Sequence, residues 1–186
     1  MPKLHVVITS TRPGRGGLAV GNWFFEAAKA HGAFDVEKVD LAAQDLPLLD
    51  EPEHPRLQKY TNEHTKRWSA KVREADAFVF VVPEYDYGMP ATLLNALHYL
   101  FHEWAYKPVG FVSYGGISGG MRSVQMSKLV IPTFRMMPIP EAVAIPFYVK
   151  QVENGVFIPQ KPQLDSVKPM LDELGKWAGA LAPLRG

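Results

Sequence analysis

The stretch Leu4-His5-Val6-Val7-Ile8 is a short apolar, β-branched run, and it continues into the polar segment Thr9-Ser10-Thr11-Arg12-Pro13-Gly14-Arg15-Gly16-Gly17. The first part is typical of a buried strand, and the second is typical of a loop that leads into a helix. A helix is indicated over residues 20–31, because one face repeats at intervals of three and four residues and Gly32 ends the pattern. The chain therefore opens with a strand, a glycine-containing loop and a helix.

The same alternation continues to the end of the chain. Residues 77–82 are continuously apolar, as in a central strand that is buried on both faces. Strands are expected over residues 4–8, 34–41, 77–82, 109–113 and 142–145. Helices are expected over residues 20–31, 57–72, 89–104, 119–136 with a kink at Pro132, and 164–181, the last beginning near Ser166 because of Pro169. Residues 150–162 are expected to be irregular. This pattern predicts a single α/β domain over residues 1–186, with a doubly wound parallel sheet.

Composition excludes several classes of function. Lys plus Arg number 20 and Asp plus Glu number 19, so charge gives no reason to expect nucleic acid or an anionic membrane as a partner. There is no cysteine, which excludes a disulfide framework, a thiolate nucleophile and a cysteine-ligated metal. Redox chemistry would therefore need a bound cofactor. The first apolar run is too short for a signal peptide, and the expectation is a cytoplasmic protein.

Doubly wound sheets bind ligands at the carboxyl ends of their strands, so the loops after the first, third and fourth strands are the candidate site. In the first loop, the hydroxyls of Ser10 and Thr11, the Arg12 guanidinium and free N–H groups at the helix start can surround a phosphate. The alternative is a polar turn with two solvated arginines. The position after the first strand favours the phosphate site.

A second motif overlaps this loop. The segment Gly14-Arg15-Gly16-Gly17-Leu18-Ala19 matches the dinucleotide fingerprint, and Asp40 lies where an acid that binds ribose would stand. That fingerprint requires its first glycine directly after the strand, whereas several polar or constrained residues intervene here. A Rossmann-type dehydrogenase remains an alternative.

The other two loops suit a flat ring. The second reads Pro83-Glu84-Tyr85-Asp86-Tyr87-Gly88-Met89-Pro90, and its tyrosines and prolines can form a rigid wall against an aromatic group. The third reads Ser113-Tyr114-Gly115-Gly116-Ile117-Ser118-Gly119-Gly120, and its glycines let main chain approach something flat or anionic. An ordinary turn and a flexible connector are the alternatives.

These motifs resemble the NADPH-dependent FMN reductase family of quinone, azo-dye and chromate reductases, from Leu4 to about Ile145. Ser10 and Arg12 match a Gly-Ser-x-Arg phosphate loop, although Thr9 replaces its glycine and Arg15 replaces a serine. Residues that match the ring-binding loop are Pro83, Glu84, Tyr85, Pro90, Asn95 and Ala96. Asp86 stands where the family has an asparagine, and such an acid beside the flavin should make reduction harder.

The resemblance implies a flavodoxin-like fold with strand order 2-1-3-4-5, helices on both faces, bound FMN, and NADPH or NADH as co-substrate. The resemblance implies these cofactor-binding residues: Ser10, Arg12, Gly16, Gly17, Leu18, Pro83, Glu84, Tyr85, Asp86, Ser113, Gly115 and Gly116. Arg15, the second arginine of the phosphate loop, is added to this set. The flavin carries the hydride chemistry, so no catalytic side chain is assigned. Tyr87 and Met89 are candidates for shaping the substrate pocket.

Partners follow from the same resemblance. It implies a homodimer or homotetramer packed through the helix that carries the aromatic residues 99–106, with the core as the alternative place for these residues. It also implies a small-molecule electron acceptor such as a quinone, azo or nitro compound, metal oxyanion or free flavin. A flavodoxin-type electron carrier is a further alternative, although carriers usually have a strongly acidic face. His98 and His102, with Glu103, have a spacing that can hold zinc, but no further ligand is evident and no metal is expected.

Overall fold

The centre of the molecule is a five-stranded parallel sheet, and the computed structural model describes residues 1–185. The strands are β1 (Lys3–Ile8), β2 (Asp35–Asp40), β3 (Ala77–Pro83), β4 (Pro108–Tyr114) and β5 (Met137–Ile145). Their order is β2-β1-β3-β4-β5, and every neighbouring pair is parallel. This confirms the flavodoxin-like prediction. The dinucleotide alternative is wrong for the fold, because it requires the order 3-2-1-4-5.

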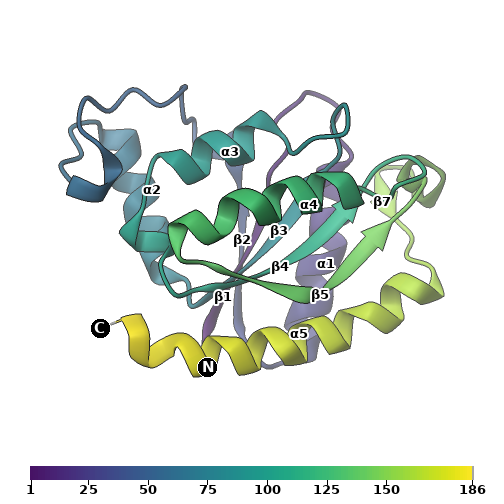
Figure 1. The fold of residues 1–186 in the computed structure, drawn as a ribbon. Helices are drawn as coiled ribbons and strands as arrows, with labels where there is room; N and C mark the ends of the chain where they lie inside the picture. Colours follow the sequence, from purple (N-terminus) through teal and green to yellow (C-terminus); the bar gives the residue numbers. More distant parts are fainter. Residues whose placement is uncertain (186) are drawn as a thin grey trace.

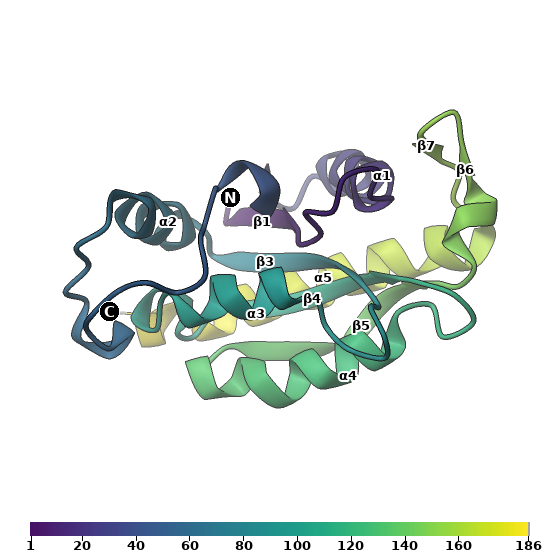
Figure 2. The ribbon, with the colours of Figure 1, turned by 90° about the horizontal axis from the view of Figure 1, so that it is seen from above.

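Helices cover both faces of the sheet (Figures 1 and 2). One face carries α1 (Gly17–His31) and α5 (Lys161–Leu181), and the other carries α2 (Glu63–Glu74), α3 (Ala91–His98) and α4 (Met121–Val130). Short 3-10 turns are η1 (Leu41–Ala43), η2 (Pro55–Leu57), η3 (His102–Trp104), η4 (Ile131–Phe134), η5 (Tyr148–Gln151) and η6 (Ala182–Arg185). A small antiparallel hairpin, β6 (Val152–Glu153) and β7 (Val156–Phe157), stands at one end of the molecule (Figure 2).

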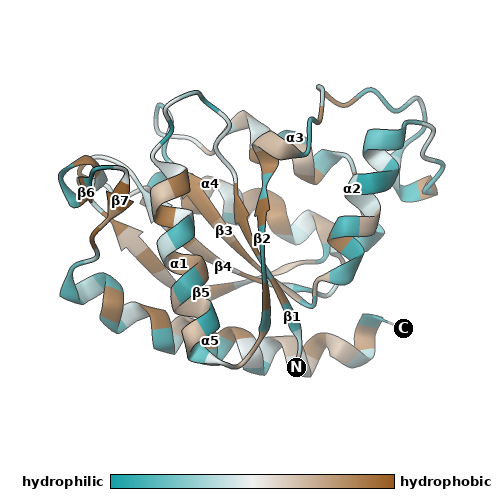
Figure 3. Ribbon diagram, turned by 180° about the vertical axis from the view of Figure 1, so that it is seen from behind, coloured by the Kyte–Doolittle hydropathy of each residue, from teal (hydrophilic) through white to brown (hydrophobic). Residues whose placement is uncertain are grey.

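Alternation along β3 divides its side chains between two cores. Phe78 and Phe80 point into the core under α2, α3 and α4, whereas Val79 and Val81 point into the core under α1 and α5. Figure 3 shows the result, with apolar strands between helices that are apolar on their inner side. Because all seven residues of β3 are buried, the continuous apolar run is what a central parallel strand requires.

The expected helix over residues 89–104 is wrong in length, because α3 ends at His98. Two buried bonds compete with its continuation. The Trp104 indole donates to the Leu97 carbonyl at 3.2 Å, and the Glu103 carboxylate accepts from the Phe101 N–H at 3.4 Å. Residues 102–104 therefore form the separate turn η3.

The expected helix over residues 57–72 is wrong at its start, because η2 ends at Leu57 and α2 begins at Glu63. Prolines are involved in the remaining corrections. Helix α5 begins at Lys161 and passes through Pro169, because Gln160 and Gln163 form a reciprocal cap and its face buries Met170 and Leu174. Helix α4 ends at Val130 and continues as η4, so the expected kinked helix over 119–136 is wrong in both bounds. Strand β5 has nine residues, not four, because an edge strand tolerates its prolines. Residues 150–162, expected to be irregular, contain the end of η5, the hairpin and the start of α5.

Candidate functional site

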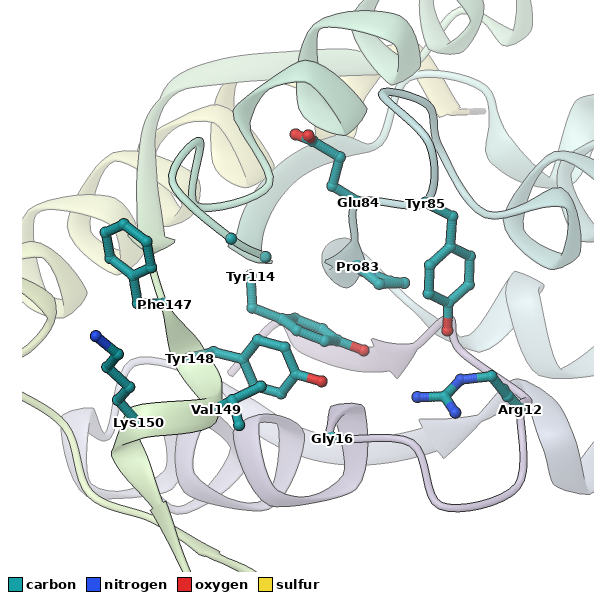
Figure 4. Close-up of a pocket in the computed structure, with 12 residues that line it drawn as sticks. Arg12, Gly16, Pro83, Glu84, Tyr85, Tyr114, Phe147, Tyr148, Val149 and Lys150 are labelled. Atoms are coloured by element: carbon teal, nitrogen blue, oxygen red, sulfur yellow. The ribbon is translucent and has the colours of Figure 1, made fainter.

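A cavity of about 350 Å³ lies where β1, β3, β4 and β5 end (Figure 4). This volume is within the range typical of small-molecule sites. The lining residues come from four loops: Arg12, Gly16, Pro83, Glu84, Tyr85, Tyr114, Gly115, Gly116, Phe147, Tyr148, Val149 and Lys150. The loops after the first, third and fourth strands therefore meet, as the sequence predicts.

The N-terminus of α1 is prepared for an anion. Gly16 is the N-cap residue and provides no side-chain cap, and the first turn contains no acidic residue. The N–H groups of this turn therefore lack intrahelical acceptors and present the positive end of the helix dipole. A Cβ on Gly17 would lie 2.3 Å from Ser10 Oγ, and one on Gly16 would lie 2.2 Å from Cε2 of Tyr148. The candidate anion site at the start of α1 therefore needs glycine at both positions.

Ser10 is completely buried beneath this turn. Its Oγ accepts a hydrogen bond from the Tyr114 hydroxyl at 3.2 Å. Because the oxygen is used as an acceptor, the hydroxyl proton of Ser10 stays available for another acceptor. The preceding Thr9 is equally buried, and its Oγ1 donates to the Val81 carbonyl at 2.8 Å. This threonine, which stands where the family pattern has glycine, therefore fixes the start of the loop to β3.

The two arginines of the first loop differ in their surroundings. Arg12 is exposed and lines the cavity, and its guanidinium lies near the Tyr85 side chain (Figure 4). Arg15 forms an ion pair with Asp40 at the end of β2 and does not line the cavity. Asp40 also accepts the Ala42 N–H at 3.0 Å. The side chain that the dinucleotide alternative assigns to a ribose is thus engaged within the protein.

The second loop is a tight hairpin turn. Tyr85 and Gly88 exchange two backbone hydrogen bonds, of 3.1 and 2.8 Å. Between them, Asp86 and Tyr87 have φ of 47° and 69°, a left-handed conformation that favours glycine and asparagine. Both side chains are exposed, Tyr87 by 71%. The loop therefore brings Tyr85 to the cavity, whereas Tyr87 lies outside the cavity lining in a backbone conformation that a tyrosine does not favour.

Glu84 lines the cavity, but its carboxylate stabilises the loops around it. Its carboxylate points away from the aromatic rings of the cavity (Figure 4) and accepts from the Ser118 hydroxyl, the Arg122 N–H and Arg122 Nε, at 2.7, 3.1 and 2.7 Å. Burial opposes ionisation, but these hydrogen bonds outweigh it and lower the pKa of Glu84. The Arg122 guanidinium in turn lies 3.6 Å from the ring centre of Tyr87. Glu84 thus ties the second loop to the third and to α4.

The third loop brings bare main chain to the cavity. Gly115 and Gly116 line it, and a Cβ on Gly116 would meet no protein atom within 4 Å. Gly120 is required for the turn itself, because its φ is 84° and a Cβ would lie 2.7 Å from the Tyr114 nitrogen. Ser113 is buried and donates to the Gly119 carbonyl at 2.8 Å, so it shapes the loop from below.

Sequence reasoning missed the aromatic side of the cavity. Phe147 and Tyr148 follow β5, and the Tyr148 ring packs edge-on against Tyr114 with centroids 4.9 Å apart (Figure 4). Phe147 is 48% exposed and has φ of 50°. The rule that ligands bind at the carboxyl ends of strands points to this loop as well, because β5 ends at the same edge.

Seven of the sequence-predicted residues line the cavity: Arg12, Gly16, Pro83, Glu84, Tyr85, Gly115 and Gly116. The other six lie around it without lining it: Ser10, Arg15, Gly17, Leu18, Asp86 and Ser113. Met89, the candidate for shaping a substrate pocket, is buried in the core. His102 contacts the Arg56 carbonyl at 3.1 Å, and Glu103 is held by Ser69, Tyr60 and Arg73, so the helical zinc pattern is not assembled.

The residues present fit FMN. An uncapped helix N-terminus beside Ser10 and Arg12 suits a terminal phosphate, and the Gly115–Gly116 main chain opposite an aromatic wall suits a flat ring system. Fold and site together define a flavodoxin-like flavoprotein. The model of the NADPH-dependent FMN reductase family matches residues 2–150, and the chain belongs to that family. It is therefore an NAD(P)H-dependent oxidoreductase with FMN as its cofactor.

Individual relatives agree with this assignment. The chain is 41% identical over 160 residues to an NAD(P)H-dependent FMN reductase of Schizosaccharomyces pombe, covering 85% of this chain and 80% of that protein. It is 30% identical over 145 residues to a quinone reductase of Pseudomonas putida, covering 74% of each. A flavoenzyme NAD(P)H:(acceptor) oxidoreductase of Paracoccus denitrificans has the same fold, with a TM-score of 0.72, 18% identity and coverage of 97% and 98%.

The length and hydropathy of the helices decide whether any of them could cross a membrane. Within residues 1–185, no helix combines the length and the apolar character needed to span a bilayer.

Proposed function

We propose that this protein transfers electrons from NAD(P)H to small planar acceptors, quinones foremost, at the open mouth of the FMN site. The observation that carries the proposal is the pair of exposed aromatic side chains, Tyr85 and Phe147, that line the cavity together with the bare main chain of Gly115 and Gly116. Such a lining accommodates flat apolar rings without demanding one pattern of hydrogen bonds. The quinone reductase of Pseudomonas putida supports the same class of acceptor.

The phosphate of FMN is assigned to the first loop. The N–H groups of the first turn of α1 and the free proton of Ser10 are the proposed donors, and Arg12 is the proposed counter-ion. Gly16, Gly17 and Leu18 would contribute main chain. Arg15 would act at a distance, because its guanidinium is paired with Asp40.

The ring system is assigned to the space between the second and third loops. Pro83, Tyr85 and Asp86 would border it on one side, with Glu84 holding that loop in place from behind. Gly115 and Gly116 would lie on the other side, with Ser113 fixing their loop. Tyr148, which packs on Tyr114, closes the inner end.

FMN supplies the hydride chemistry when it is bound, as an acceptor from the nicotinamide and a donor to the second substrate. The chain's own task is then to orient both substrates and to hold the cofactor. Two carboxylates near the cavity are already engaged, Glu84 by Ser118 and Arg122, and Asp40 by Arg15. We therefore assign no general acid or base.

A homodimer or homotetramer is part of the proposal. The aromatic residues Tyr99, Phe101 and Trp104 belong to the core, so they are not available to a partner. The proposed contact instead uses the exposed apolar side chains of α4, Met126 at 41% and Leu129 at 81% exposure. Light scattering of the purified protein tests this, and a mass of 20.8 kDa would contradict it. Separately from the oligomeric state, we propose that the protein is located in the cytoplasm.

The test of function is a visible absorption spectrum of the protein loaded with FMN, followed by anaerobic NADPH and then a quinone. We expect the flavin bands to bleach with NADPH and to return with the quinone. An electron carrier would bleach only with a partner reductase, and NADPH oxidation that ignores FMN would favour a dehydrogenase. Bleaching without recovery by quinones would reject this acceptor class while leaving the family assignment intact.

A further inference from the structure

A second cluster of chemically active side chains lies on the other side of the molecule from the cofactor loops. His5 is the third residue of β1, and Glu37 of β2 is its direct neighbour in the sheet register. Glu74, the last residue of α2, comes to the same place. One ligand atom of each of these three residues lies within 4.8 Å of the others. Three separate elements thus converge on one point.

His5 is the unusual member of this cluster. Its side chain is only 1% exposed, and its Nε2 is buried without any hydrogen-bond partner. A buried polar atom without a partner is costly and calls for an explanation. This nitrogen faces Glu37 Oε2 at 3.5 Å, and the ring packs edge-on against Phe78. The imidazole is therefore fixed in place and directed at the carboxylates without bonding to them.

The 3.5 Å separation has a specific meaning for a metal ion. Zinc binds imidazole nitrogen and carboxylate oxygen at roughly 2.0–2.2 Å, so tetrahedral geometry places two ligand atoms roughly 3.4 Å apart. His5 Nε2 and Glu37 Oε2 are separated by nearly this distance. We propose that His5, Glu37 and Glu74 bind one divalent transition-metal ion of the zinc type, with water as the fourth ligand.

The donor set favours this class of metal. One imidazole nitrogen with two carboxylates suits zinc, whereas magnesium and calcium prefer oxygen ligands throughout. The bound ion would join β1, β2 and the end of α2, which are separated by more than 30 residues each in the chain. Since a ligand that binds only the folded state stabilises it, the expected consequence is structural.

Two lysines compete with the ion. Lys71 Nζ contacts Glu37 at 2.8 Å and Glu74 at 3.1 Å, and Lys3 Nζ lies 3.7 and 3.5 Å from the same two carboxylates. Both lysine side chains are about one-third exposed, so each can swing into solvent when a metal enters. Their charges must weaken metal binding, and removing one of them should strengthen it.

The test uses the FMN-loaded protein after treatment with a chelator. Zinc chloride is titrated by calorimetry, with thermal unfolding measured in parallel and magnesium chloride as the comparison. We expect one zinc ion per chain and a higher unfolding temperature with zinc only. Glu74→Gln should weaken zinc binding by about tenfold or more, and Lys71→Met should tighten it. Flavin absorbance should stay unchanged in both variants, which reports that each is folded.

Glu63→Gln is the matched control, because Glu63 is an exposed glutamate of the same helix that lies outside the cluster. It should bind zinc as the parent does. A second control is His64→Gln, which removes the exposed His64–Asp50 pair. The proposal is overturned if the parent protein binds no zinc, if Glu74→Gln binds it unchanged, or if His64→Gln abolishes binding. Cobalt(II) in place of zinc should give the intense visible bands of a tetrahedral site, and weak octahedral bands would also count against it.

Discussion

The hydroxyl of Tyr114, at the end of β4, donates to Ser10 Oγ, after β1, at 3.2 Å, across 104 positions of sequence. Both groups are buried. Burial is the largest cause that raises the pKa of Tyr114, so its hydroxyl keeps its proton at neutral pH and remains a donor. The direction of this bond leaves the proton of Ser10 available for the proposed phosphate of FMN, so the bond would connect the proposed ring end of the site to its proposed phosphate end.

The first prediction removes that bond. Tyr114→Phe should weaken FMN binding by about tenfold. Without the Tyr114 hydroxyl, Ser10 loses its orientation and with it the proposed hydrogen bond to the charged phosphate, which contributes roughly 1.5 kcal/mol. Quenching of FMN fluorescence during titration measures the dissociation constant. Tyr106→Phe removes a hydroxyl far from the site, which contacts Arg135 at 3.4 Å, and it should bind FMN as the parent does. Equal affinities of the two variants would show that Tyr114 does not orient Ser10.

The second prediction separates cofactor contact from protein packing. A Cβ on Gly116 meets no protein atom within 4 Å, so Gly116→Ala should leave the stability of the FMN-free protein unchanged. If the ring lies against this main chain, the same change should weaken FMN binding at least tenfold. Urea unfolding and FMN titration measure the two quantities.

Gly179→Ala is the control for that experiment. Gly179 lies within α5, and an added Cβ also meets nothing within 4 Å. Alanine there should raise the stability by about 0.5–1 kcal/mol through helix propensity and leave FMN binding unchanged. Unaltered FMN affinity in Gly116→Ala would place the ring elsewhere.

The third prediction compares the two arginines of the first loop. Arg12→Gln should weaken FMN binding more than tenfold and make the affinity less sensitive to salt, because an exposed counter-ion of the phosphate is lost. Arg15→Gln should have a smaller effect, because Arg15 is paired with Asp40. Titrations at low and high salt measure both. The reverse order would mean that Arg15 leaves Asp40 when FMN binds.

The sequence was sufficient for the sheet because its signals there are local. The apolar run ending at Pro83 cannot be accommodated except as a central strand, and the loops after Ile8 and Tyr114 carry glycine and hydroxyl residues where parallel strands end. Seven predicted site residues accordingly line the cavity. Their positions depend only on which loops follow which strands.

What could not be predicted depends on contacts between distant segments. The end of α3 at His98 is set by the bond from Trp104 to Leu97 and by the buried Glu103, which no local pattern reveals. Helix α5 runs through Pro169 because its packed face outweighs one lost backbone bond. The pairing of Arg15 with Asp40, and the convergence of His5 with two glutamates, likewise appear only after the chain has folded.

The fourth prediction concerns acid stability. Burial lowers the pKa of His5 from 6.5 to about 4 in the folded protein. Between these two values the unfolded chain binds the extra proton and the folded protein does not, so stability falls as pH decreases from about 6.5 to about 4. Above pH 6.5 both states are neutral and this contribution is fully present. The loss between pH 7 and pH 5 should be about 2 kcal/mol.

Urea unfolding at pH 7 and pH 5 measures this loss, with His5→Gln as the test variant. The variant should lose about 2 kcal/mol less than the parent over this interval, whatever its stability at pH 7. His54→Gln, which alters an exposed histidine, should retain the full loss. A parallel loss in the parent and in His5→Gln would assign the acid sensitivity to the carboxylates.

The last prediction concerns Asp86, which stands where the family has an asparagine. Its backbone has φ of 47° and its side chain is exposed beside the proposed ring. Asp86→Asn should change two properties, the unfolding temperature of the protein and the reduction potential of the bound flavin. Asparagine is better suited to the left-handed conformation, which raises the unfolding temperature, and loss of a negative charge makes the cofactor easier to reduce. The potential should rise by less than about 30 mV, because water screens an exposed carboxylate.

A redox titration against indicator dyes, together with thermal unfolding, separates the two effects. Asp35→Asn removes an exposed carboxylate at the start of β2, at the opposite edge of the sheet from the cofactor loops, and should leave the potential unchanged. A higher unfolding temperature with the parent's potential would mean that the Asp86 carboxylate points away from the ring, so that the residue acts through the turn alone. A higher potential with an unchanged unfolding temperature would mean the opposite: the turn is already held by the two bonds between Tyr85 and Gly88, and the aspartate tunes the flavin by charge.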